Sequence, residues 1–466
     1  MRSNIAYDAQ DLWTKDRDHV VHGWADFGSF HETGSEILVE GDGPYVWDVD
    51  GRKLIDGIGG VWCVNVGYGR SEIVDAIAEQ ARRLPYANPF HSTSTPPAAQ
   101  LAAKLVELAP DNIDHVFYAT GGSTANDSAL RIVQHYFNHL GQDDRKIVIS
   151  RHSAYHGSTA VSAALSGLDF NKVGFDTPEE NIRYVSAPYA YRRPDGMSLE
   201  AFCDHLVEEF NDTVLEIGPE RVAAFFAEPI MGMGGVIDPP PGYFRRISQI
   251  CKRHGILVIA DEVVTGFCRL GEFFASDSLF EMVPDLISCA KGLTSGYLPM
   301  GATLISREVF EVIGKPIEAG AMFTHGFTYS GHPVCCAAAV ANIEVMETID
   351  LCGHVRKMGA YFEEGIRSLM DLPIVGDVRG QKFMMGIESV ANKETKELLP
   401  FEADVGHRTS NHARELGLIL RPLAHLNILS PCLILERDEI DRIVDILRTS
   451  LLRTQDDLVR EGFWSG

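Results

Sequence analysis

The fold is decided by GILVIADEVVTGF at residues 255–267, followed by DLISCAKGLTSGYLPMGA at residues 285–302. Each stretch begins with a short apolar run and then turns polar, at Asp261 in the first and at Lys291 in the second. Short apolar runs bounded by turn residues are typical of buried strands. Because both runs end in a side chain that can ionise, we expect a functional site where these strands end.

Three further apolar runs have the same character: HVFYA at 115–119, KIVIS at 146–150 and VAAFFAE at 222–228. Helical stretches lie between them, and this alternation is typical of a mostly parallel sheet covered by helices. Open sheets of this kind bind ligands outside the carboxyl ends of their strands. The sequence therefore predicts an α/β fold whose functional residues follow the strands.

The flanking segments indicate a second, smaller domain. ILVEGDGPYVWDVDGRKLIDG at 37–57 carries the turn signals of hairpins, and a helix with Ser71 as N-cap is predicted over 71–84. Because 466 residues exceed what one core usually supports, we expect more than one domain. The predicted division is the N-terminal part of the small domain at 1–80, a large domain at 81–335, and the C-terminal part of the small domain at 336–466.

Composition excludes several classes of function. The net charge of −24 disfavours binding to nucleic acid or to anionic membranes. No apolar run approaches the roughly 18 residues of a membrane helix, and the N-terminus has no signal-like apolar core. The nine cysteines include no C-x-x-C pair, which predicts reduced thiols, no metal site and a cytoplasmic protein.

A glycine-rich turn, ATGGSTAND at 119–127, follows HVFYA and opens a helix. Free N–H groups at a helix start form an anion site, and glycines let a phosphate approach the backbone. A tight turn before an N-cap explains the same residues. The turn does not match the G-x-G-x-x-G spacing of dinucleotide sites, so it disfavours a nicotinamide cofactor.

Only the combination of Asp261, Lys291 and Tyr155 indicates a functional site. Alone, Asp261 is better explained as a structural carboxylate, Lys291 as a solvated surface group and Tyr155 as a core residue. At adjacent strand ends, however, a carboxylate can keep a pyridine nitrogen protonated and a desolvated lysine can supply a neutral amine. Tyr155, followed by His156 after the KIVIS run, can stack on a flat ring.

The chain resembles the class III aminotransferases, or ω-transaminases, of pyridoxal-phosphate fold type I. The resemblance extends from WDVDGRKLIDGIGGVWCVNVGYG near the N-terminus to RPLAHLNILSPCLIL near the C-terminus. Its strongest blocks are FFAEPIMGMGGVIDPPPGYF, LVIADEVVTGFCRLG, AKGLTSGYLPMGA and HGFTYSGHPV, in that order. It implies a large domain with a mostly parallel seven-stranded sheet and a smaller α+β domain, with pyridoxal 5′-phosphate as cofactor.

The resemblance also implies roles for matching residues. Lys291 would form the internal aldimine with the cofactor and move the proton between the substrate and the cofactor. Asp261, supported by Glu228, would pair with the pyridinium nitrogen. The other implied cofactor-binding residues are Tyr155 and Val263 on the two ring faces, His156 beside Tyr155, Gly122 and Ser123 at the phosphate, and Phe327 and Thr328 from a neighbouring subunit. A homodimer is therefore the expected minimum active unit.

One departure from the family pattern is visible in the phosphate segment. The family usually has S-G-S-E-A-N, whereas residues 121–126 read Gly-Gly-Ser-Thr-Ala-Asn. The first serine and the glutamate are missing, which removes polar side chains near the phosphate. Backbone donors should still hold it.

Four residues are predicted to bind substrate. Arg421 matches the mobile arginine of the family, and its guanidinium would pair with the carboxylate of a 2-oxo acid, with pyruvate expected. A surface arginine is the alternative. Trp62 matches an active-site wall residue, and Tyr86 and Phe90 are candidates for the entrance, although a core or loop role fits them equally. The expected donors are amines or ω-amino acids; taurine, β-alanine, diamines and arylalkylamines stay open.

The implied activity is ping-pong transamination, and two other interpretations compete with it. The first is an aminomutase or a decarboxylase that uses the same cofactor on the same fold. The second is a binding protein that retains an enzyme fold without catalysis. It is the weakest, because Lys291, Asp261 and Tyr155 are all present.

Overall fold

A seven-stranded sheet forms the centre of the protein. The computed structural model describes residues 7–315 and 322–465. The central sheet runs in the order β4 (Ile113–Ala119), β10 (Gly301–Ser306), β9 (Leu286–Cys289), β8 (Leu257–Asp261), β7 (Val222–Ala227), β5 (Ile147–Arg151) and β6 (Ile182–Val185). Strands β6, β5, β7, β8 and β9 are parallel, whereas β10 is antiparallel to both of its neighbours. The predicted seven-stranded, mostly parallel sheet is confirmed.

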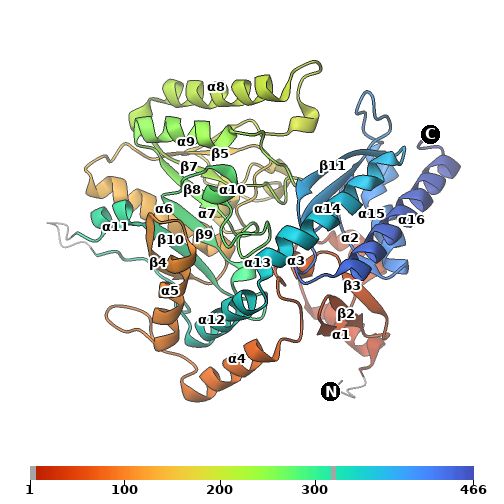
Figure 1. Ribbon diagram of the computed structural model, residues 1–466, viewed down its shortest axis with the longest axis horizontal. Coiled ribbons are helices and arrows are strands. Elements are labelled where there is room, and N and C mark those ends of the chain that lie inside the picture. Colours follow the sequence, from red (N-terminus) through yellow and green to blue (C-terminus); the bar gives the residue numbers. More distant parts are fainter. Residues whose placement is uncertain (1–6, 316–321, 466) are drawn as a thin grey trace.

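The apolar runs form strands because helices cover both faces of the sheet. All six residues of β7 are buried, as expected for a strand with no solvent-facing side. Helix α6 packs against β4, β8, β9 and β10, whereas α9 packs against β8 beside α8. Figure 1 shows α8 and α9 along one flank of the sheet. The covering helices include α5 (Pro96–Leu108), α6 (Gly122–His139), α7 (Ala160–Leu165), α8 (Leu199–Ile217), α9 (Tyr243–His254), α10 (Ser276–Phe280) and α11 (Arg307–Ile313).

Two four-stranded sheets lie beside the central one. The first has the order β1 (Leu38–Asp42), β2 (Tyr45–Asp48), β3 (Lys53–Asp56) and β13 (Leu418–Ile419), and the second has the order β11 (Val375–Gln381), β12 (Met384–Ser389), β15 (Leu426–Leu429) and β14 (Arg421–Leu423). Because β13 pairs with β3, the first sheet joins the N-terminal and C-terminal parts of the chain, and β3 and α16 lie on the same side of the molecule in Figure 1. The division into domains at 1–80, 81–335 and 336–466 stays a prediction. Residues 1–6, 316–321 and 466, which belong to these ranges, lie outside the described residues.

The remaining helices complete the outer parts of the fold. They are α1 (Ala9–His19), α2 (Phe27–Thr33), α3 (Gly59–Trp62), α4 (Ser71–Arg83), α12 (Pro333–Thr348), α13 (Leu351–His354), a π-helical turn at Val355–Gly359, α14 (Ala360–Arg367), α15 (Val405–Glu415) and α16 (Arg437–Glu461). Within the described ranges, no helix combines the length and apolar character that crossing a membrane requires.

Two local expectations need correction. Ser71 is the first residue of α4 rather than its N-cap; Arg70 occupies that position without a side-chain cap. Cys268 and Cys352 form a disulfide, so the expectation that all thiols are reduced is wrong for this pair. The two cysteines are separated by 84 residues in the sequence, and such a contact between distant segments leaves no spacing pattern to detect.

Candidate active site

The carboxyl ends of the parallel strands meet at a cavity of about 160 Å³. Lys291 follows β9, Asp261 ends β8 and Glu228 follows β7. The structure brings together nine of the residues predicted from the sequence: Trp62, Gly122, Ser123, Tyr155, His156, Glu228, Asp261, Val263 and Lys291. The position of the site at this edge of the sheet follows from strand direction alone.

Lys291 occupies the most unusual environment in the cavity. Burial lowers the pKa of its ammonium group, although Cys63, Asp261 and Glu228 act in the opposite direction. In the described part of the chain its Nζ has no hydrogen bond or ion pair, and it lies 5.5 Å from the centre of the Trp62 ring. The backbone of Lys291 is left-handed, with φ of 44°. A left-handed backbone is unfavourable for a lysine, so the surrounding structure must hold it in place.

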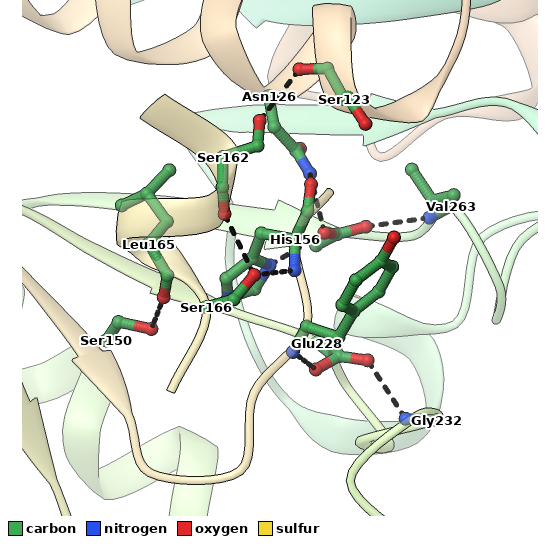
Figure 2. Close-up of polar contacts among 12 residues, drawn as sticks. Ser123, Asn126, Ser150, His156, Ser162, Leu165, Ser166, Glu228, Gly232 and Val263 are labelled. Atoms are coloured by element: carbon green, nitrogen blue, oxygen red, sulfur yellow. Dashed lines mark hydrogen bonds and ion pairs between the residues drawn. The ribbon is translucent and has the colours of Figure 1, made fainter. Parts of the chain in front are cut away.

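Asp261 is held by three hydrogen bonds on one side of the cavity. Its Oδ2 accepts from His156 Nδ1 at 2.8 Å and from Asn126 Nδ2 at 2.8 Å, and its Oδ1 accepts from the Val263 N–H at 3.1 Å. Figure 2 shows three of these partners, Asn126, His156 and Val263. Only 4% of Asp261 is exposed, so its orientation is fixed and its negative charge is directed at whatever occupies the cavity.

Glu228 fixes the loop that carries Tyr155. Its carboxylate accepts from the Tyr155 N–H at 3.1 Å and from the Gly232 N–H at 2.9 Å. Figure 2 shows the bond between Glu228 and Gly232. Burial raises the pKa of Glu228. Glu228 lies in the same cavity as Asp261, but the side chains that hydrogen-bond Asp261 are those of Asn126 and His156.

The start of α6 forms the expected cradle for an anion. Gly121 at the N-cap provides no side-chain cap for the first N–H groups of the helix. A Cβ at Gly122 would lie 2.9 Å from Val263 Cγ1, and one at Gly157 would lie 2.4 Å from Ser123 Oγ, so both positions need glycine. Thr124, which replaces the glutamate of the family pattern, accepts from the Thr120 N–H and donates to the Gly121 carbonyl. It therefore ties the turn together.

Arg421 and Lys291 both place their charged groups near the ring of Trp62. The guanidinium carbon of Arg421 is 5.3 Å from the centre of the Trp62 ring, and its Nη2 is 3.3 Å from Met233 Sδ. Arg421 has no carboxylate partner among the described residues, and burial lowers its pKa. A guanidinium with an unused fork is suited to bind a carboxylate ligand.

Four predicted residues form a separate group. Tyr86 donates its hydroxyl to the Thr328 carbonyl at 3.0 Å, and Phe90 packs against Gly326, next to Phe327. None of the four lines the cavity that contains Lys291. Tyr86 and Phe90 are about 40% exposed, and a second cavity of about 190 Å³ lies against residues 87–89.

Sequence reasoning missed four lining residues: Asn126, Gly157, Met233 and Val264. Asn126 lies about one turn after Ser123 on α6, and this spacing could have identified it, because residues three or four apart share a helix face. Met233 and Val264 are apolar residues in loops, and nothing in their local pattern distinguishes them from core residues.

Comparisons with known proteins agree with this geometry. The family described as aminotransferase class III matches residues 31–451. The central sheet has the architecture of the fold type I transaminases. The chain belongs to the class III aminotransferase family, and it is an aminotransferase.

Relatives and solved structures cover nearly the whole chain. The putrescine–pyruvate aminotransferase of Pseudomonas aeruginosa is 40% identical over 439 residues, which cover 94% of this chain and 95% of that protein. An (S)-enantioselective ω-transaminase from Thermomicrobium roseum has a TM-score of 0.93 at 36% identity, covering 96% of this chain and 99% of its own. The ω-transaminase from Pseudomonas jessenii, solved with PMP, also has a TM-score of 0.93 at 36% identity, covering 96% and 98%.

Proposed function

We propose that this aminotransferase moves an amino group from an amine or ω-amino acid to a 2-oxo acid, with pyridoxal 5′-phosphate as its cofactor and pyruvate as its acceptor. The observation that carries the proposal is the pairing of Lys291, whose burial lowers its pKa, with the fixed carboxylate of Asp261 in one cavity. A neutral amine and a buried carboxylate in one small cavity are the two groups that this cofactor requires.

The residues of the cavity fit the cofactor. His156 Nε2 and Asn126 Oδ1 are buried without hydrogen-bond partners in the described chain, so the polar wall around Asp261 is not fully satisfied. We assign the phosphate to Gly122 and Ser123, the ring nitrogen to Asp261, and the two ring faces to Tyr155 and Val263. When bound, the cofactor supplies an aldehyde that reacts with amines and a ring that withdraws electrons.

The protein groups then perform separate tasks. Lys291 exchanges a proton at the carbon that carries the amino group, because its lowered pKa makes the neutral amine available. Asp261 keeps a proton on the ring nitrogen by its negative charge. The cavity excludes water around both groups, which strengthens these interactions.

Arg421 explains how one site serves two substrates. When the donor is an amine without a carboxylate, the guanidinium stays against Trp62. In the second half-reaction it pairs with the carboxylate of the 2-oxo acid. Because both substrates use the same cavity in turn, the kinetics should be ping-pong, with parallel lines in double-reciprocal plots.

A panel of donors with pyruvate tests the activity. Purified protein is mixed with pyruvate and with putrescine, β-alanine, taurine or an arylalkylamine, and the alanine formed is measured. The Pseudomonas aeruginosa relative, named for putrescine and pyruvate, supports a diamine as the first donor to test. Alanine from at least one donor supports the proposal. If no donor gives alanine, the aminomutase or decarboxylase alternative is favoured.

We also propose that the protein is a cytoplasmic homodimer, in which Phe327 and Thr328 complete the phosphate site of the partner subunit. The separate group that contains Tyr86, Phe90, Phe327 and Thr328 supports this arrangement, because these residues lie outside the cavity lining of their own chain.

A further inference from the structure

A guanidinium group next to the active site is completely enclosed by protein. Arg151 is the last residue of β5, and its side chain is 0% exposed. Its Nη2 donates to the main-chain carbonyl of Glu228 at 2.6 Å, whereas its Nε and Nη1 have no hydrogen-bond partner within the described residues. A buried cation without a direct ionic partner is costly, so its presence requires an explanation.

Tyr243 on α9 favours the charged form of Arg151, and the carboxylates Glu228 and Asp261 of the active-site cavity act in the same direction. Burial lowers the pKa of Arg151, while Tyr243, Glu228 and Asp261 raise it. Its guanidinium carbon is also 5.4 Å from the centre of the Phe244 ring on α9. Arg151 does not line the cavity, so it acts on the site only through its neighbours.

Among the residues of the cavity, Glu228 is the one whose main chain Arg151 hydrogen-bonds. Both carboxylate oxygens of Glu228 accept main-chain N–H groups, from Tyr155 and from Gly232. The titratable groups that face it are Arg151 from β5, His156 from the following loop, Asp261 from β8, and Lys291 after β9. A protonated Glu228 would turn one acceptor oxygen into a donor and break one of its two bonds.

We propose that Arg151 is a positioning residue of this site: its hydrogen bond fixes the Glu228 main chain, and its nearby positive charge favours the form of the Glu228 carboxylate in which both oxygens accept. Both carboxylate oxygens then remain acceptors, and the loop that carries Tyr155 keeps its place. The consequence for cofactor stacking on Tyr155 rests on the proposed function, whereas the coupling between Arg151 and Glu228 does not.

Thermal unfolding of the full-length apoprotein tests the coupling without any cofactor. The four proteins are wild type, Arg151→Met, Glu228→Gln and the double variant, each measured between about pH 5.5 and 8.5. A carboxyl group whose folded pKa is raised costs stability as the pH rises through that pKa. Removing the cation raises it further, so the melting-temperature gap between wild type and Arg151→Met should widen with pH, by about 2 °C per added pKa unit.

In the Glu228→Gln background the same gap should stay constant with pH. A gap that does not change with pH in the wild-type background would overturn the proposal, as would a pH-dependent gap that persists without Glu228. If Arg151→Met does not fold, Arg151→Gln replaces it, since this variant keeps a donor for the Glu228 carbonyl but lacks the charge.

Arg145, two residues before the start of β5, provides a matched control. It is also buried, and it donates to the carbonyls of Val222 and His254. Arg145→Met should lower the melting temperature by an amount that does not depend on pH. A widening gap for this variant too would show that loss of any buried guanidinium has this effect, and would contradict the proposal.

Titration of the apoprotein with pyridoxal phosphate provides the second readout. Relative to wild type at the same pH, Arg151→Met should bind about tenfold more weakly at low pH for each unit by which the Glu228 pKa rises, and should recover at high pH. An equal defect at every pH would leave Arg151 a purely structural residue. If wild type itself does not bind, the proposed function fails, but the unfolding comparison still decides the role of Arg151.

Discussion

At the residue scale, Lys291 lowers the stability of the fold because its amine is buried. Burial lowers its pKa, and no acidic side chain within the described part of the chain forms an ion pair with it. An alkyl chain of similar length would bury the same volume without a charge to desolvate. The fold therefore bears a cost at Lys291 that only its chemistry explains.

Lys291→Met should raise the melting temperature of the apoprotein near neutral pH. A lysine whose folded pKa is lowered costs stability below that pKa, and the cost disappears as the pH rises toward its unfolded value of 10.5. The gain from Lys291→Met should accordingly shrink as the pH is raised. Thermal unfolding from pH 7 to 10 measures this, and a gain that grows with pH would contradict a lowered pKa.

Arg421→Ala should impair the use of pyruvate far more than the use of an amine that carries no carboxylate. Hydrogen bonds between charged groups contribute about 1.5–3 kcal/mol, so the KM for pyruvate should rise roughly 10- to 100-fold. The KM of an amine donor without a carboxylate should change by less than about threefold. Arg421→Lys keeps the charge but loses the fork, and should give an intermediate value. Equal losses for both substrates would show that Arg421 supports the fold and does not select the acid.

Prediction from sequence worked for residues whose position follows from a strand end. Asp261 and Lys291 could be placed because an apolar run determines where each side chain emerges. Arg151 ends β5 in the same way, but whether its guanidinium turns toward solvent or into the core depends on packing from Tyr243 and Phe244. No local pattern carries that information.

At the element scale, the loop after β8 connects the central sheet to the rest of the chain. Cys268 is bonded to Cys352, and the buried guanidinium of Arg269 donates to the carbonyls of Phe383 and Pro431. Arg356 donates to the Gly271 carbonyl. This loop continues directly from Asp261, so its attachments hold one side of the active site to segments that are distant in the sequence.

Reduction of the Cys268–Cys352 disulfide should lower the stability of the protein. A crosslink that spans 84 residues stabilises by about 4.5 kcal/mol in the chain-entropy description, although measured values are typically 2–4 kcal/mol. Denaturant unfolding with and without a reductant should show this loss. The Cys268→Ser/Cys352→Ser double variant should be equally destabilised and should not respond to reductant. Two additional free thiols in the unreduced native protein would contradict the disulfide.

Strands were missed by the sequence prediction where their formation depends on tertiary packing. The strands β5, β7, β8 and β9 could be predicted because each is a continuous apolar run. The strand β10 was missed because GATLIS continues from a glycine-rich turn, and β6 was missed because Ile-Arg-Tyr-Val mixes polar and apolar residues at the sheet edge. An edge strand is half exposed, so its sequence has a weaker signal.

At the scale of the whole molecule, the chain holds the candidate active site and a separate group of predicted residues outside its cavity. Tyr86, Phe90, Phe327 and Thr328 form that group. The architecture of the central sheet could be predicted from alternation, and the resemblance to the family added the number of strands. The relation between two subunits could not be predicted from periodicity, because no single chain records it.

Mixing two inactive variants tests the homodimer. Thr328→Asp should weaken cofactor binding by repulsion from the phosphate, and Lys291→Ala should abolish turnover. If Thr328 acts in the partner's site, a mixed dimer contains one site with both native residues, so mixing should restore transamination. Light scattering should give twice the mass of one chain. A monomer that is fully active would exclude this arrangement.

The central claim is that Lys291 binds pyridoxal phosphate covalently. Borohydride reduction of the purified protein, followed by proteolysis and mass spectrometry, tests it most directly, with Lys291→Ala as the matched control. The account predicts a yellow protein in which the cofactor becomes fixed to the peptide that contains Lys291, and no fixed cofactor in Lys291→Ala. An unlabelled Lys291 peptide, or a label on another lysine, would contradict the claim.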